Sequence, residues 1–223
     1  MKTVLITGAN RGIGLALARR FKQRGDRVIA VCRGASDELE ALGVDIIDGV
    51  DVTDAAQVRR LPERLGDRRI DVLMLNAGVL ADEALDRLDD DALASIRRQF
   101  EVNAIAPLHL AAVLQGHLGE GGKVAITTSR MGSIADNGSG GRYGYRMSKA
   151  AVNAAGKSLA NDLRGRGIAV VLLHPGFVQT DMVGGRGDVS ADEAAAGLVA
   201  RVDELTLDTS GSFRHAKGDA LPW

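Results

Sequence analysis

The chain has 223 residues, the size of one α/β domain, and its 28 basic and 29 acidic residues give a formal net charge of −1, which argues against nucleic-acid and membrane-surface partners. No apolar run reaches the roughly 18 residues of a membrane span, and the single cysteine, Cys32, excludes an internal disulfide framework and a cysteine-based metal site. Because no signal-peptide pattern precedes the first strand-like run, we expect a reducing, cytoplasmic location, and the scattered histidines predict no metal.

Short apolar runs alternate with helix-patterned segments along the chain. The strands are predicted at residues 2–7, 27–32, 44–50, 70–75, 123–128, 168–174 and, as a short seventh, 212–215. Helices are predicted at residues 12–24, 39–42, 54–65, 89–118, 143–164 and 190–203, with a bend or break at Pro107. Crossovers of this length force parallel strands, so we predict one doubly wound, Rossmann-like α/β domain over residues 1–223.

A glycine-rich turn joins the first strand to the first helix and reads Thr7-Gly8-Ala9-Asn10-Arg11-Gly12-Ile13-Gly14. Gly8 can take the positive φ of a tight turn, Gly12 leaves room for a pyrophosphate, and Gly14 lets the helix and strand pack closely. Free N–H groups at the helix start attract phosphates. We therefore expect a dinucleotide site here, with a purely structural turn as the alternative.

Tyr145 and Lys149 are four residues apart and so share one face of a predicted helix. Reducing a carbonyl requires a proton on its oxygen, and a phenol with a pKa of about 10 is a weak donor at neutral pH. An ammonium about 4 Å away supplies roughly the 4 kcal/mol that lowers this pKa by about three units. Ser129, at the end of the fifth strand, can hydrogen-bond the substrate oxygen, although Thr128 and Ser133 are competitors.

The end of the second strand indicates the cofactor. An NAD enzyme usually carries an acidic residue there for the ribose hydroxyls, but this chain has Cys32. Arg33 follows and can pair with a 2′-phosphate, and Arg11 can add a second positive charge. We therefore expect NADP(H) rather than NAD(H), although the nearby Asp37 and Glu38 keep NAD(H) as an alternative.

Seven landmarks stand in one order along residues 3–185. They are the T-G-x-x-x-G-x-G turn, Asp51-Val52, Asn76-Ala77-Gly78, Asn103, Thr128-Ser129, Tyr145-x-x-x-Lys149, and Pro175-Gly176 followed by Thr180-Asp181. This order resembles the short-chain dehydrogenase/reductase family. Residues 128–133 and the closing Leu221-Pro222-Trp223 are most similar to the Sniffer/C-factor-like carbonyl reductases.

The resemblance implies a strand order 3-2-1-4-5-6-7 and NADPH-dependent reduction of an aldehyde or ketone by hydride transfer. The implied catalytic residues are Ser129, Tyr145 as proton donor, Lys149, and Asn103, which would hold a water that links Lys149 to solvent. The expected cofactor-binding residues are Gly8, Asn10, Arg11, Gly12, Ile13, Gly14, Arg33, Asp51, Val52, Asn76, Ala77, Gly78, Tyr145, Lys149, Pro175, Gly176, Val178 and Thr180.

The expected partners are a small-molecule carbonyl substrate and further copies of the chain, in a homodimer or homotetramer formed through residues 93–114 and 152–163. Loops 132–142 and 180–187 should shape the substrate pocket, with Met131, Phe177 and Met182 as candidate lining. Two alternatives remain open. One is a signalling or scaffold protein that binds a cofactor on the same fold, and the other is an NAD-dependent alcohol dehydrogenase.

Overall fold

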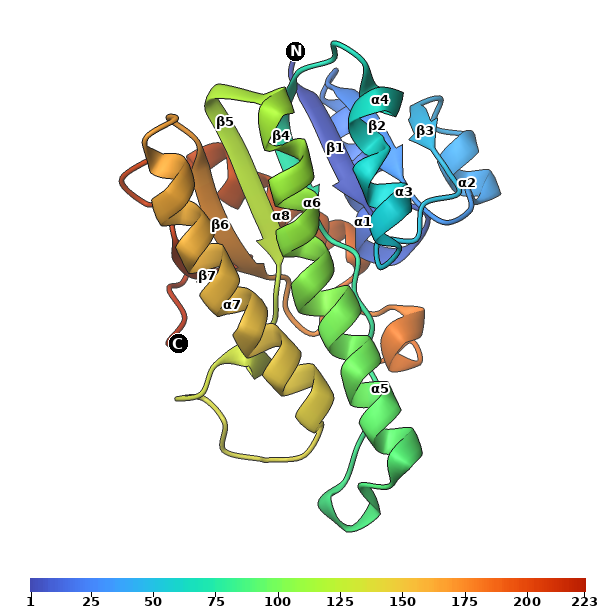
Figure 1. Ribbon diagram of the computed structural model, residues 1–223, viewed down its shortest axis with the longest axis vertical. Coiled ribbons are helices and arrows are strands. Elements are labelled where there is room, and N and C mark those ends of the chain that lie inside the picture. The colour runs from blue at the N-terminus through green and yellow to red at the C-terminus, as the bar shows by residue number, and fades with distance from the viewer.

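A seven-stranded sheet runs through the molecule, and the computed structural model describes residues 1–223 (Figure 1). The strands are β1 (Thr3–Thr7), β2 (Arg27–Val31), β3 (Asp45–Ile47), β4 (Ile70–Leu75), β5 (Leu118–Thr127), β6 (Ala169–His174) and β7 (Ser212–His215). Every pair is parallel, in the order β3-β2-β1-β4-β5-β6-β7. This confirms the predicted doubly wound fold and its strand order.

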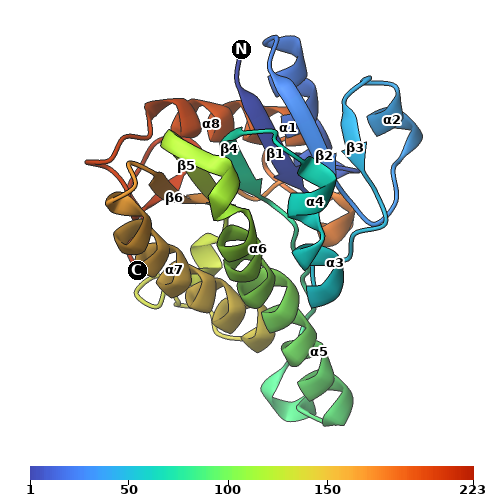
Figure 2. The ribbon, with the colours of Figure 1, turned by 45° about the horizontal axis from the view of Figure 1, so that its top comes forward.

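Helices cover both faces of the sheet. They are α1 (Gly12–Gln23), α2 (Asp37–Glu40), α3 (Ala55–Arg59), α4 (Leu61–Leu65), α5 (Asp90–Phe100), α6 (Ala106–Leu114), α7 (Tyr143–Arg164) and α8 (Ala191–Glu204). Strand side chains alternate between the faces, so Val4 and Ile6 pack in the cluster of α1 and α8, whereas Leu5 packs with α3, α4, α6 and α7. Figure 2 shows α5 projecting beyond the sheet.

Three predicted elements differ in the structure. The helix expected over residues 54–65 is two short helices, because Pro62 lacks an N–H and lies in the first turn of a new helix, α4. The third strand is shorter than residues 44–50, and Gly49 at φ +69° lies beyond its end. Strand β5 begins at Leu118, inside the expected helix 89–118, and the pairing with β4 shifts before Lys123.

The bend expected at Pro107 takes a specific form. Helix α5 ends at Phe100, a π-helical turn covers Glu101–Ile105, and α6 then starts at Ala106 with the proline in its first turn. Proline cannot donate a backbone hydrogen bond to the preceding turn, so the ladder is rearranged where that donor is missing. The rearranged turn carries Asn103.

The strand order determines where a ligand can bind. The chain builds outward from β1 to β3 and then crosses to β4 on the other side of β1. The carboxyl ends of β1 and β4 therefore form a topological switch point, the usual ligand crevice of an open α/β sheet. A membrane-crossing helix needs a long apolar stretch, which no helix of this structure provides.

Candidate active site

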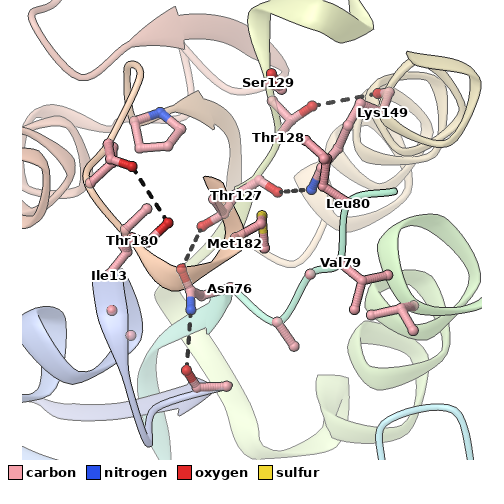
Figure 3. A pocket seen from close by; sticks show the side chains of 18 of the residues that line it. Ile13, Asn76, Val79, Leu80, Thr127, Thr128, Ser129, Lys149, Thr180 and Met182 are labelled. Atoms are coloured by element: carbon pink, nitrogen blue, oxygen red, sulfur yellow. Dashed lines mark hydrogen bonds between the residues drawn. The ribbon is translucent and has the colours of Figure 1, made fainter. Parts of the chain in front are cut away.

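A cavity of about 600 Å³ opens at the carboxyl edge of the sheet. It extends from the glycine turn after β1 to the loops that follow β5 and β6 (Figure 3). Every predicted site residue lines it except Asn103; the lining set is Gly8, Asn10, Arg11, Gly12, Ile13, Gly14, Arg33, Asp51, Val52, Asn76, Ala77, Gly78, Ser129, Tyr145, Lys149, Pro175, Gly176, Val178 and Thr180. The fold thus brings together residues from distant parts of the sequence.

The glycine turn has the geometry of a phosphate cradle. Gly8 and Gly12 have φ values of +67° and +53°, in the left-handed region that favours glycine. A Cβ on Gly14 would overlap the carbonyl oxygen of Gly8, so glycine is required for α1 to approach β1 this closely. No side chain caps the amino end of α1 and its first turn holds no acidic residue, so its free N–H groups suit an anion.

Asn76 fastens the ends of three strands beneath the cavity (Figure 3). Its backbone N–H donates to Thr7 Oγ1 at 3.0 Å, and its Nδ2 donates to the Thr7 carbonyl at 3.2 Å. Its Oδ1 accepts from Thr127 Oγ1 at 3.3 Å. Because these bonds join β1, β4 and β5, they fix the floor of the cavity.

Tyr145 and Lys149 lie one turn apart on α7, facing the ends of β5 and β6. Lys149 is buried, and its Nζ donates to the Thr127 carbonyl at 2.9 Å and lies 5.7 Å from the centroid of the Tyr145 ring. Burial lowers the pKa of Lys149 to about 8. Desolvation raises the pKa of Tyr145, and the neighbouring Ser129 hydroxyl and the charge of Arg142 act against that rise.

The structure separates Ser129 from its two competitors. Thr128 directs its hydroxyl to Asn153 Oδ1 at 2.7 Å, and Ser133, which lies off the cavity, donates to the Trp223 carbonyl at 3.2 Å. Ser129 Oγ accepts from the N–H of Met131 at 3.1 Å, and its hydroxyl lies within hydrogen-bonding reach of the Tyr145 side chain. Ser129 is therefore the hydroxyl best placed beside Tyr145.

Asn103 lies just outside the cavity wall. Its Oδ1 accepts from the N–H of Val79 at 2.9 Å, and its Nδ2 donates to the Val79 carbonyl at 2.8 Å and to Ser148 Oγ at 3.1 Å. The side chain thus holds the segment after β4 against α7. Its role as the holder of a water beside Lys149 stays a prediction.

Two polar side chains on α5, Ser95 and Gln99, also hold the segment that follows β4. Gln99 accepts from the N–H of Ala81 at 3.1 Å and donates to the buried carboxylate of Glu83, which also accepts from Ser95 Oγ at 3.2 Å. Glu83 Oε2 in turn accepts from the N–H of Gly144 at 3.1 Å. This network was not predicted from the sequence, although the four-residue spacing from Ser95 through Gln99 to Asn103 places all three on one face of the expected helix.

The adenosine end of the cavity carries the residues expected to select the cofactor. Arg33 is exposed, lines the cavity and has no hydrogen-bond or ion-pair partner, while Cys32 is buried. Arg11 lies 3.5 Å from Asp181, so its charge is shared. Asp37 and Glu38 belong to the first turn of α2 and do not line the cavity.

The substrate end is closed by the loop after β5 and by the loop after β6. Met131, Phe177 and Met182 line the cavity as expected. Trp223 braces the first loop, because its carbonyl accepts from the N–H of Ala135 at 3.0 Å as well as from Ser133, and its ring lies 5.5 Å from that of Phe213. The charged residues that line this end were not predicted from the sequence; they are Arg130, Asp136, Arg142 and Arg146. Arg142 and Arg146 flank Tyr145 in the sequence, and that basic pair was the available signal.

Comparison with known proteins identifies the family. The model of the short chain dehydrogenase family matches residues 2–190. The chain is 42% identical to 1-hydroxy-2-glutathionyl-2-methyl-3-butene dehydrogenase of Rhodococcus sp. over the full length of both, and 43% identical to the C-signal protein of Myxococcus xanthus over 69% of this chain and 93% of that protein. A carbonyl reductase of Pseudomonas aeruginosa PAO1 in complex with NADP has 38% identity and a TM-score of 0.84, with both chains fully covered. The chain belongs to the short-chain dehydrogenase family of oxidoreductases.

Proposed function

We propose that the protein is an NADPH-dependent reductase that converts an aldehyde or ketone to the alcohol. The meeting of Ser129, Tyr145 and Lys149 on the wall of the cavity that starts at the glycine turn carries this proposal. The Pseudomonas relative, a carbonyl reductase in complex with NADP, supports it.

The cavity suits NADP(H). The uncapped amino end of α1 and the bare Cα of Gly12 suit the pyrophosphate, and the unpartnered Arg33 suits the 2′-phosphate. Asp51 and Val52 would border the adenine. Asn76, Ala77 and Gly78 would line the middle of the cofactor, and Pro175, Gly176, Val178 and Thr180 would meet its carboxamide end. When bound, NADPH supplies the hydride that reaches the carbonyl carbon.

The side chains of the site supply the rest of the reaction. Ser129 donates a hydrogen bond to the carbonyl oxygen and polarises it. Tyr145 transfers its phenolic proton to that oxygen as negative charge develops there. Desolvation raises the pKa of Tyr145 and so disfavours its anion. The positive charge of the Lys149 ammonium acts in the opposite direction and stabilises the tyrosinate that forms. A water held near Asn103 would return a proton to Tyr145 through Lys149.

Consumption of NADPH against a panel of aldehydes and ketones tests the proposal. We expect turnover with some of the panel, and we expect Tyr145→Phe to remove nearly all of it. Absence of turnover with every carbonyl compound would contradict the proposal. A Tyr145→Phe variant that keeps a cellular role would favour the signalling alternative.

A second candidate is the reverse reaction, oxidation of an alcohol. The observation in its favour is the Rhodococcus relative, which matches over the full length of both chains and is named as a dehydrogenase. The same three side chains serve both directions, because Tyr145 can accept the proton it otherwise gives. Initial rates with NADPH, NADH, NADP⁺ and NAD⁺ in matched assays distinguish the two.

We further propose a cytoplasmic homodimer or homotetramer formed through residues 93–114 and 152–163, which belong to α5, α6 and α7. Leu93 on α5, Leu108 on α6 and Met147 on α7 are exposed apolar side chains of these central helices. Burying them against an equivalent surface removes them from water. Light scattering after size-exclusion chromatography gives the oligomeric state, and a monomer would contradict the proposal.

A further inference from the structure

A second hollow, of about 460 Å³, lies next to the reaction cavity. It shares Met131, Arg142 and Arg146 with that cavity, so the two spaces are neighbours with part of their wall in common. Its other charged lining residues are Asp82, Glu83 and Arg87. A substrate bound at Tyr145 therefore lies beside a strongly charged region, and Arg142 and Arg146 line both spaces.

The two acidic residues of this hollow are already engaged. Glu83 is buried and accepts hydrogen bonds from Gln99, Ser95 and Gly144. Asp82 accepts from Arg142 Nε at 2.5 Å. Neither carboxylate is free to neutralise the remaining arginines.

Two guanidinium groups of the hollow have no acidic partner. Arg87 is exposed and its side chain makes no hydrogen bond or ion pair. Arg146 donates only to neutral oxygens, namely Ser139 Oγ at 2.8 Å and the carbonyls of Gly140 and Gly141 at 3.3 and 3.2 Å. These bonds hold Arg146 in place and leave its positive charge uncompensated.

The hollow is also close to the reacting groups. Arg146 follows Tyr145 directly, and Arg142 lies near enough for its charge to oppose the rise in the pKa of Tyr145 that desolvation causes. Arg142 is the one non-glycine residue with a positive φ, +52°. Such a conformation persists only where its surroundings hold it, and it is frequent at functional sites.

We propose that the substrate is a carbonyl compound with a carboxylate tail, which binds Arg87 and Arg146 while the carbonyl reaches Ser129 and Tyr145. The inference rests on the proposed reductase function and names its substrate class. A guanidinium recognises a carboxylate through charge-assisted, often paired hydrogen bonds. A neutral carbonyl compound of the same shape lacks these bonds.

The test compares two aldehydes that differ only in the tail, 4-formylbenzoate and its methyl ester, with NADPH. The wild-type kcat/KM should be about 10- to 100-fold higher for the acid, as expected for a charge-assisted hydrogen bond. Arg87→Gln and Arg146→Gln should each reduce this preference by about 10-fold, and added salt should weaken it. Arg59→Gln, which removes an exposed charge of α3 outside both spaces, should leave the preference unchanged.

Arg87→Gln is the decisive variant because Arg87 has no partner whose loss could disturb the fold. Equal kcat/KM values for the acid and the ester in the wild type would overturn the inference and leave carbonyl reduction intact. An acid preference that survives in both Arg87→Gln and Arg146→Gln would also overturn it. Absence of NADPH consumption with both aldehydes, while other carbonyl compounds of the panel turn over, would overturn this inference alone, and absence with the whole panel would overturn the reductase function as well.

Discussion

The ammonium of Lys149 is held by the carbonyl oxygen of Thr127, at 2.9 Å, and not by a carboxylate. A buried cation with a neutral partner keeps its full charge for the group it faces, here the Tyr145 ring. It also remains costly to bury, which is why the pKa of Lys149 falls to about 8. The same contact therefore bears on both catalysis and stability.

Removing the Tyr145 hydroxyl should stop proton transfer and leave the cavity intact. We expect Tyr145→Phe to lower kcat by about 10²-fold or more, the usual contribution of a general acid. NADPH binding, followed by fluorescence titration, should stay close to that of the wild type. Unchanged turnover would remove Tyr145 from the mechanism.

Lys149→Met should damage two properties at once. Turnover should fall because the developing tyrosinate loses its stabilising charge, and cofactor affinity should fall because Lys149 is expected to touch the nicotinamide ribose. Single-turnover kinetics and cofactor titration measure the two effects separately. A loss of turnover with full cofactor affinity would show that the ribose contact is wrong.

The same variant should be more stable than the wild type at neutral pH. The pKa of Lys149 is about 8 in the folded state against an ordinary 10.5, so below pH 8 the folded protein holds a buried charge that costs up to roughly 3 kcal/mol. Between about pH 8 and 10.5 the folded state releases this proton while the unfolded state keeps it, so wild-type stability rises with pH.

Urea unfolding of both proteins at pH 7.0 and 9.5 checks this prediction. The advantage of Lys149→Met should shrink at the higher pH. The comparison stops below pH 10, because Tyr145 has a raised pKa when folded, and ionisation of the unfolded chain would then lower stability. A Lys149→Met protein that is less stable at pH 7.0 would show that the Thr127 hydrogen bond outweighs the buried charge.

Arg33 should determine the preference for NADPH. A charge-assisted hydrogen bond contributes roughly 1.5–3 kcal/mol, so its loss in Arg33→Ala should weaken NADPH binding by about 10- to 100-fold. NADH lacks the 2′-phosphate, so the affinity for NADH should change little. Cys32→Asp should shift preference further toward NADH through new ribose bonds and repulsion of the phosphate.

The readout for both variants is kcat/KM with each cofactor. Equal losses for NADPH and NADH in Arg33→Ala would show that Arg33 does not recognise the phosphate. Arg11 would then be the next candidate, although its ion pair with Asp181 must first be broken.

Two glycines of one loop should respond differently to alanine. A Cβ on Gly132 would lie 2.6 Å from the carbonyl carbon of Lys149, whereas one on Gly138 meets nothing within 4 Å. Gly132→Ala should therefore cost about 1–3 kcal/mol of stability and lower kcat, because it moves the loop that carries Ser129 away from α7. Gly138→Ala should change stability by less than about 0.5 kcal/mol. Thermal unfolding and turnover of both variants, measured together, would reject this account if they behaved alike.

The sequence predicted those parts of the fold that depend on local pattern. Helix α7 spans residues 143–164 as expected, because its apolar spacing is regular and a glycine follows it. The extent of β5 could not be predicted, since the glycine-rich residues 119–122 resemble a loop, and β4 pairs with Leu118 before them and with Lys123 after them. A proline near the end of the expected helix 54–65 weakens its last turn, but only the folded structure shows that Pro62 lies in the first turn of a second helix.

The residues of the candidate site also fall into those that the sequence predicts and those that only the folded structure brings together. Ser129 was predicted from its place at the end of a strand, because parallel strands bring their carboxyl ends together, whereas Asn76 was implied by the family resemblance. Glu83 was not predicted, since its partner Gly144 is distant in sequence and the two meet only where α5 approaches α7. The second hollow, which Arg87 and Arg146 line, was not predicted either, because it depends on the path of an irregular loop that has no periodic sequence pattern.

The brace from Trp223 has a consequence for exchanging substrate specificity between relatives. The loop at residues 129–142 keeps its shape partly through the carbonyl of a residue far along the chain, so it is not a self-contained module. A chimera that receives the loop alone inherits a wall without its support. The transferable unit is the loop together with residues 221–223 and the surface of Phe213 against which Trp223 rests.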